Sequence, residues 1–84
     1  MSTLMTESNI LRAVKLWFTE EKIYVLLSDD REIAVPLKWF PHLFTATEKQ
    51  RNNWRLIGKG IGIHWEDIDE DLSAQGLLNN LLEQ

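Results

Sequence analysis

The chain has 84 residues, of which 44% are hydrophobic and none is cysteine, and its formal net charge at pH 7 is -4. This length allows one small domain, the apolar content excludes wholesale disorder, and the lack of cysteine excludes disulfides, thiolate metal ligands and thiol nucleophiles. The negative charge disfavours broad electrostatic binding to nucleic acid, and no segment resembles a signal peptide or membrane span, so we expect a cytoplasmic protein.

Three apolar segments in the first half of the chain predict β-strands: residues 10–18, 22–28 and 31–37. Asp29 and Asp30 predict a two-residue hairpin connection, because aspartate tolerates positive φ better than most residues. Pro36 cannot donate a ladder hydrogen bond, so the third strand ends or lies at a sheet edge there. The simplest arrangement is an antiparallel meander.

The second half predicts helices. The aromatic segment 38–44 predicts a short turn that covers the core. Thr47 and Gln50 have the spacing of a capping box, which predicts a helix from Thr47 to Ile57, ended by Gly58. Residues 61–65 predict a short extended segment, and Ser73 has the character of an N-cap for a second helix over 74–82.

These elements together predict an α+β fold. It consists of a small antiparallel three-stranded meander followed by two helices, with a short extended segment between them. The whole chain, 1–84, forms one domain, and residues 1–9 are expected to be a disordered tail.

One cluster could be drawn as a metal or acid–base site: His64 with Asp67, Asp69, Glu70 and Asp71. These four acids and Glu66 form an acidic block. The spacing is poor, because an EF-hand loop needs a central glycine that is missing here. The preferred interpretation is that these acids precede the Ser73 cap and complement the helix dipole and nearby cations. His64 would then be a positioned, hydrogen-bonded residue beside Trp65, and we expect no cofactor and no bound metal.

The glycines at positions 58, 60 and 62 could cradle a phosphate, with Lys59 adding charge. The segment lacks the Walker spacing and follows a predicted helix instead of a strand, so helix termination is the better interpretation. No Gly-x-Ser-x-Gly motif surrounds any serine, which argues against a hydrolytic triad.

Aromatic and cationic residues define a candidate contact surface, because tryptophan and arginine are enriched at binding hot spots. Its members are Trp39, Phe40, His42, Lys49, Arg51, Arg55 and Lys59. The four tryptophans, at positions 17, 39, 54 and 65, are expected mostly in the core, with one or two exposed. The leucine stripe at 77, 78, 81 and 82 is either core packing or a dimer seam.

Several short segments form a recognisable set: Pro36 to Pro41 (PLKWFP), Ala46 to Arg51 (ATEKQR), Asn53-Trp54, Ile57 to Trp65 (IGKGIGIHW), Asp69 to Ser73 (DEDLS) and Gly76-Leu77-Leu78. Together they resemble the small bacterial "domain of unknown function 2442" family. The signature residues are His64, Trp65, Asp69, Glu70, Asp71 and Ser73. Glu66 stands where the family usually has proline. Because the sequence ends at Gln84, we expect this protein to lack the helix-turn-helix domain that some relatives append.

The resemblance implies an α+β fold, a prokaryotic or phage source, and a gene often lying beside a partner of toxin–antitoxin type. With no catalytic constellation in the sequence, the leading hypothesis is a protein-binding module, the antitoxin-like or regulatory member of a two-component system. Its partner would be another protein, with a homodimer possible and no membrane. The alternative is a dimeric regulator that binds DNA or RNA through the basic helix, and a third hypothesis is a metal-dependent enzyme at His64.

Overall fold

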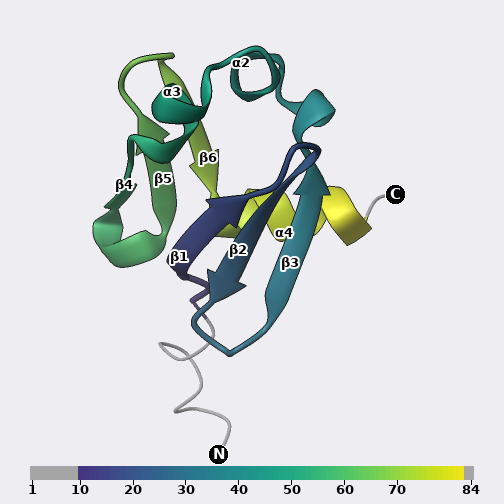
Figure 1. Ribbon diagram of the computed structural model, residues 1–84. Helices are drawn as coiled ribbons and strands as arrows, with labels where there is room; N and C mark the ends of the chain where they lie inside the picture. The colour runs from purple at the N-terminus through teal and green to yellow at the C-terminus, as the bar shows by residue number, and fades with distance from the viewer. Residues whose placement is uncertain (1–9, 83–84) are drawn as a thin grey trace, which may run out of the picture.

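The computed structural model describes residues 10–82, so the expected tail at 1–9 lies outside the described residues. Two antiparallel sheets are joined by short helices and followed by a longer helix (Figure 1). The elements are β1 (Ala13–Phe18), β2 (Lys22–Leu27), β3 (Glu32–Pro36), η2 (Leu37–Trp39), α2 (Pro41–Phe44), α3 (Glu48–Asn52), β4 (Trp54–Ile57), η3 (Gly58–Gly60), β5 (Gly62–Trp65), β6 (Glu70–Ser73) and α4 (Ala74–Leu82). The α+β class is confirmed.

The first sheet is the predicted meander, with strand order β1-β2-β3. Its inner side chains form rows across the strands, such as Leu16–Val25–Ile33, and all three of these residues are buried. Residue alternation explains this, because successive side chains of a strand point to opposite faces. Asp30 adopts φ 73° in the β2–β3 turn, where Arg31 O accepts a hydrogen bond from Leu27 N at 2.8 Å.

The second sheet, with order β4-β5-β6, corrects the predicted helix from Thr47 to Ile57. The capping box of Thr47 and Gln50 is present, but α3 ends at Asn52 and a strand follows. Trp54 and Leu56 pair with Trp65 and Ile63 of β5. The period-two alternation of residues 54–57 prevailed over the helical spacing because a sheet partner was available.

The glycine segment joins two strands instead of ending a helix. Gly58, Lys59 and Gly60 all have positive φ, of 60°, 59° and 102°. A Cβ on Gly60 would lie 2.2 Å from Ala13 O, so the turn packs directly against the start of β1. Only glycine allows both this backbone conformation and this approach.

The C-terminal helix α4 begins as predicted. Ser73 Oγ accepts a hydrogen bond from Gly76 N at 2.9 Å, and a Cβ on Gly76 would lie 2.7 Å from that same hydroxyl. Leu77 is buried and Leu78 packs against the core, so this part of the leucine stripe belongs to the core. The side chains of Leu81 and Leu82 lie outside the described set.

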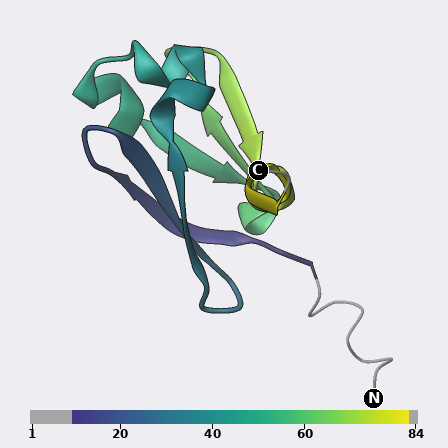
Figure 2. The ribbon, with the colours of Figure 1, turned by 90° about the vertical axis from the view of Figure 1, so that its right-hand side faces the viewer.

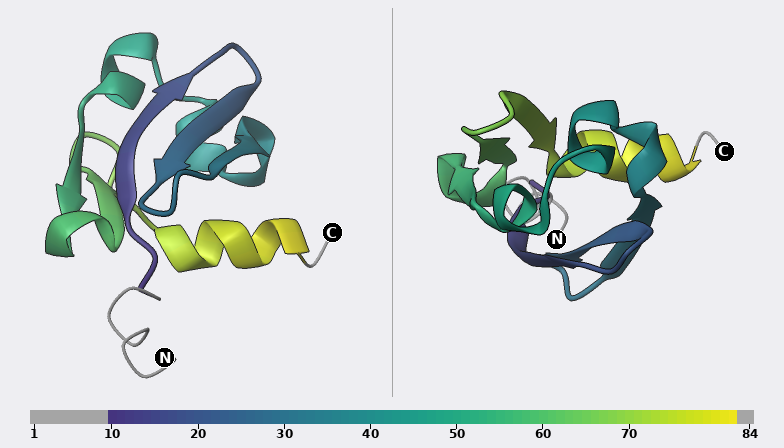
Figure 3. Two further views of the ribbon diagram at one scale, coloured as in Figure 1. Left: turned by 90° about the horizontal axis from the view of Figure 1, so that it is seen from below. Right: turned by 45° about the horizontal axis from the view of Figure 1, so that its top comes forward.

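The core lies between the two sheets and α4. In views from the side and from below, α4 and the second sheet lie on one side of the first sheet (Figures 2 and 3). The aromatic segment covers one end, as predicted, with Phe40 and Leu43 buried. Trp65 is fully buried and the other three tryptophans are half-buried. Within residues 10–82, no helix is long and apolar enough to cross a membrane.

Candidate binding surface

The predicted aromatic contact residues divide between core and surface. Phe40 is buried and Trp39 is half-buried against the core, whereas His42 is exposed on α2. Phe40 is therefore unavailable to a partner. The exposed aromatic residue of this segment is instead Phe44, with 51% of its surface accessible. The side of the short helix α2 that faces the core decides which of these rings is exposed. No pattern in the sequence predicts that side.

Arg51 stabilises the fold by hydrogen bonds to residues of other elements. Its Nε and one terminal nitrogen donate hydrogen bonds to Leu43 O and Phe44 O, each at 2.9 Å, at the end of α2. Its own carbonyl accepts a hydrogen bond from Trp65 Nε1 at 2.8 Å. Arg51 thereby connects α2, α3 and β5.

The other predicted cations do not form one helical face. Lys49 is exposed on α3, but Arg55 is on strand β4 and Lys59 is in the turn that follows. The predicted basic helix is thus wrong beyond Asn52. The Arg55 guanidinium lies 3.9 Å from the carboxylate of Glu66, the residue that follows β5.

The acidic block has partners within the chain. Asp67 accepts a hydrogen bond from the Asn53 amide at 3.0 Å. Two histidine–carboxylate pairs follow: His42 with Glu70 at 3.0 Å, and His64 with Asp71 at 2.5 Å.

Asp69, another acid of the block, has φ 52° in the turn before β6. The block therefore lies along the β5–β6 hairpin, which leads directly to the Ser73 cap of α4. Among residues 10–82, no group of three histidine or carboxylate side chains is placed to hold a metal ion.

An open hollow adjoins Phe44. It is lined by Glu21, Lys22, Pro36, Lys38 and Phe44, with a volume of about 520 Å³. Phenylalanine and proline supply an apolar floor and two lysines supply positive charge. We call this set the Phe44 hollow.

The outer face of the first sheet is a second exposed surface. Trp17 stacks on Tyr24, with ring centroids 5.8 Å apart and planes within 5°. Lys15 Nζ lies 5.7 Å from the centre of the Trp17 ring. None of these residues was among the predicted contact residues, although the alternation that buries Ile23 and Val25 also places Tyr24 on the opposite face.

The fold and these surfaces define a small α+β domain of two antiparallel sheets, with an exposed phenylalanine on α2 and a half-buried tryptophan–tyrosine stack on the outer face of the first sheet. The chain belongs to the family described as "Protein of unknown function (DUF2442)", whose model matches residues 13–83. The resemblance seen in the sequence is thus confirmed.

Two solved structures are similar to this chain. A protein of unknown function from Rhodospirillum rubrum shares 31% identity and a TM-score of 0.74, over 86% of this chain and 89% of that one. An uncharacterized protein from Chromobacterium violaceum, solved by NMR, shares 25% identity and a TM-score of 0.69, over 92% of this chain and 71% of that one. No curated protein matches at a significant level. The family and these structures give no sign of enzymatic activity.

Proposed function

We propose that this domain is a non-enzymatic protein-binding module and that Phe44 is the centre of its contact surface. The observation that carries the proposal is the 51% exposure of a phenylalanine on an ordered helix. Exposed aromatic side chains beside a hollow are typical of binding hot spots, because burying them against a partner removes a large apolar area from water.

The backbone of Phe44 is held in place before any partner arrives. Pro41 begins α2 with its φ already restricted, and Thr45 Oγ1 donates to Pro41 O at 3.0 Å. Arg51 holds the carbonyl of Phe44 itself. A preorganised anchor loses little conformational entropy on binding, which favours affinity.

The hollow also indicates the chemistry of the partner. Phe44 and Pro36 suit an apolar side chain, and Lys22 and Lys38 suit a carboxylate beside it. The family resemblance supports an antitoxin-like or regulatory role in a two-component bacterial or phage system. The partner would then be a toxin-like protein encoded by a neighbouring gene.

The dispersal of the cations favours a protein partner over nucleic acid. Arg51 is directed at carbonyl oxygens and Arg55 faces Glu66, so neither adds to a continuous basic stripe. Binding to a phosphate backbone depends on such a stripe.

The test is a binding measurement between this chain and the product of the neighbouring gene, by calorimetry. Phe44→Ala should weaken binding about tenfold or more, because truncating a hot spot costs about 2 kcal/mol or more. Ile61→Ala is the matched control, since Ile61 is similarly exposed, at 45%, on the β4–β5 turn. The proposal fails if no stable protein partner exists or if both variants bind like the parent.

A further inference from the structure

We propose that the outer face of the first sheet binds the same face of a second copy of this chain, about a two-fold axis parallel to the strands. This face adjoins the Phe44 hollow at Lys22 and Pro36, which pair across β2 and β3. The inference does not depend on the hollow, because the two rows that carry it contain none of the residues that line the hollow. It follows from how the side chains of the face are arranged in rows.

Two complete rows cross the outer face. One runs Lys15–Leu26–Glu32 and the other Trp17–Tyr24–Ala34. Leu26, Trp17, Tyr24 and Ala34 are half-buried, and the two charged residues at the ends of the first row are exposed. Figure 2 shows α4 and the second sheet on the other side of this sheet.

The described part of the chain therefore leaves this face open. A row with a cation at one end, an anion at the other and an apolar centre is complementary to itself when reversed. A two-fold axis along β2 reverses each row.

The reversed row places Lys15 opposite Glu32 of the second copy, and Glu32 opposite Lys15, so two ion pairs form by symmetry. The same operation places the large Trp17 opposite the small Ala34. Large-to-small pairing lets two sheet faces approach closely, as in sheet-on-sheet packing.

The other in-plane axis is much less suitable. An axis perpendicular to the strands, through the row of Tyr24, would place Leu26 opposite Lys22, because Lys22 is the next outward residue of β2. That contact would cover an ammonium group with an apolar side chain. With the axis along β2, Lys22 lies opposite Lys22 of the second copy, at the exposed end of the face. These two like charges limit the contact at that end.

The contact is small. Three strands and five residues along each strand give a footprint of roughly 14 by 17 Å per copy. This is below the size of standard interfaces, so we expect a weak dimer, with a Kd on the order of 100 µM. Such a dimer forms only at high local concentration.

Sedimentation equilibrium at protein concentrations between about 10 µM and about 1 mM tests the arrangement. Two variants are compared with the parent, and they change the net charge in opposite directions. In a Lys15→Glu dimer, two carboxylates meet at each end of the contact, and in a Glu32→Lys dimer two ammonium groups meet. Each variant alone should dimerise at least about tenfold more weakly than the parent. An equimolar mixture of the two should recover the association of the parent, because each end of the mixed dimer again joins opposite charges.

The controls are Lys49→Glu and Glu48→Lys, which change the net charge equally on exposed positions of α3. Both should dimerise like the parent. The inference is overturned if the parent remains monomeric at about 1 mM, if either single variant dimerises as the parent does, or if the mixture associates no better than its components.

Discussion

The two sheets of this domain obtain their structure in different ways. The first has strands of five or six residues, joined by short turns, with an aliphatic inner face and an aromatic outer face. The second has strands of four residues, and it depends on a glycine turn against β1, a buried tryptophan and several polar pairs. The first sheet is therefore specified locally and the second by contacts with the rest of the molecule.

This difference shows where the domain is most easily disrupted. Removing one contact of the second sheet should cost more than a similar change on the first, because short strands have few ladder hydrogen bonds of their own. Paired substitutions in the two regions make the comparison quantitative.

Gly60→Ala should have the largest effect. The added Cβ would overlap Ala13 O, and the alanine would have to adopt φ 102°. We therefore expect a loss of about 3 kcal/mol or more in the free energy of unfolding. Urea denaturation followed by tryptophan fluorescence measures it. Gly62→Ala is the control, because a Cβ there would lie 3.5 Å from Leu72 O, an ordinary contact. Equal losses in the two variants would contradict the close approach of η3 to β1.

Trp65→Phe should destabilise the domain by about 2 kcal/mol. It removes a hydrogen bond of 2.8 Å to Arg51 O, leaves that carbonyl unpaired, and opens space in the core. Trp17→Phe, on the outer face of the first sheet, should cost less than about 1 kcal/mol because the ring is only half-buried. Thermal unfolding of both variants compares the two sheets directly, and a larger loss at Trp17 would reverse the proposed ranking.

Arg51→Ala should cost about 1 to 2 kcal/mol, since two hydrogen bonds from a charged donor to the end of α2 are lost. Arg51→Lys should recover little, because a single ammonium cannot reproduce the paired geometry of a guanidinium. Lys49→Ala, an exposed change on the same helix, should be nearly neutral. Chemical denaturation of the three variants tests this. Full rescue by lysine would mean that charge alone matters.

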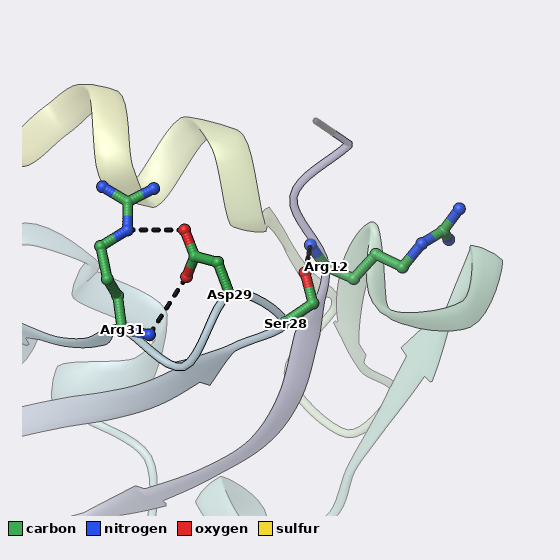
Figure 4. A network of polar contacts seen from close by, with 4 residues as sticks. All are labelled: Arg12, Ser28, Asp29 and Arg31. Atoms are coloured by element: carbon green, nitrogen blue, oxygen red, sulfur yellow. Dashed lines mark hydrogen bonds and ion pairs between the residues drawn. The ribbon is translucent and has the colours of Figure 1, made fainter. Parts of the chain in front are cut away.

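The smallest effect should come from pH at the β2–β3 turn, where Arg31 bonds to Asp29 (Figure 4). The backbone N–H of Arg31, aided by its guanidinium, lowers the pKa of the Asp29 carboxyl below its ordinary value of 3.8. A lowered folded-state pKa adds stability above the unfolded pKa, and that stability is lost as pH falls through the folded value. NMR titration of Asp29 should show a midpoint below 3.8.

Arg31→Gln sharpens the pH experiment, because it removes the guanidinium and keeps the backbone N–H. Much of the lowering of the Asp29 pKa should survive, since that N–H is its largest cause. A pKa that returned fully to 3.8 in this variant would assign the effect to the guanidinium instead.

The candidate site was less predictable than the fold. The sequence predicted contact residues in segment 38–44, but the exposed ring there is Phe44, and Arg51 donates hydrogen bonds to the backbone of α2. The spacing of residues in the sequence predicts neither the exposure of Phe44 nor the hydrogen bonds of Arg51, because both depend on which side of a short turn faces the core. Arg55 was grouped with Lys49 because a helix was expected from Thr47 to Ile57, and Lys59 was added because it belongs to the same cation-rich stretch of sequence.

The sequence by itself determined the elements that repeat a pattern over several residues. The meander, the capping box at Thr47 and the Ser73 cap of α4 all rest on local alternation or local hydrogen bonds, which need no distant partner. Only the tertiary structure decided residues 54–57 and 70–73, which are too short to specify a strand alone. Their strand conformation comes from pairing with β5, whose Ile63 and Trp65 are fixed in the common core.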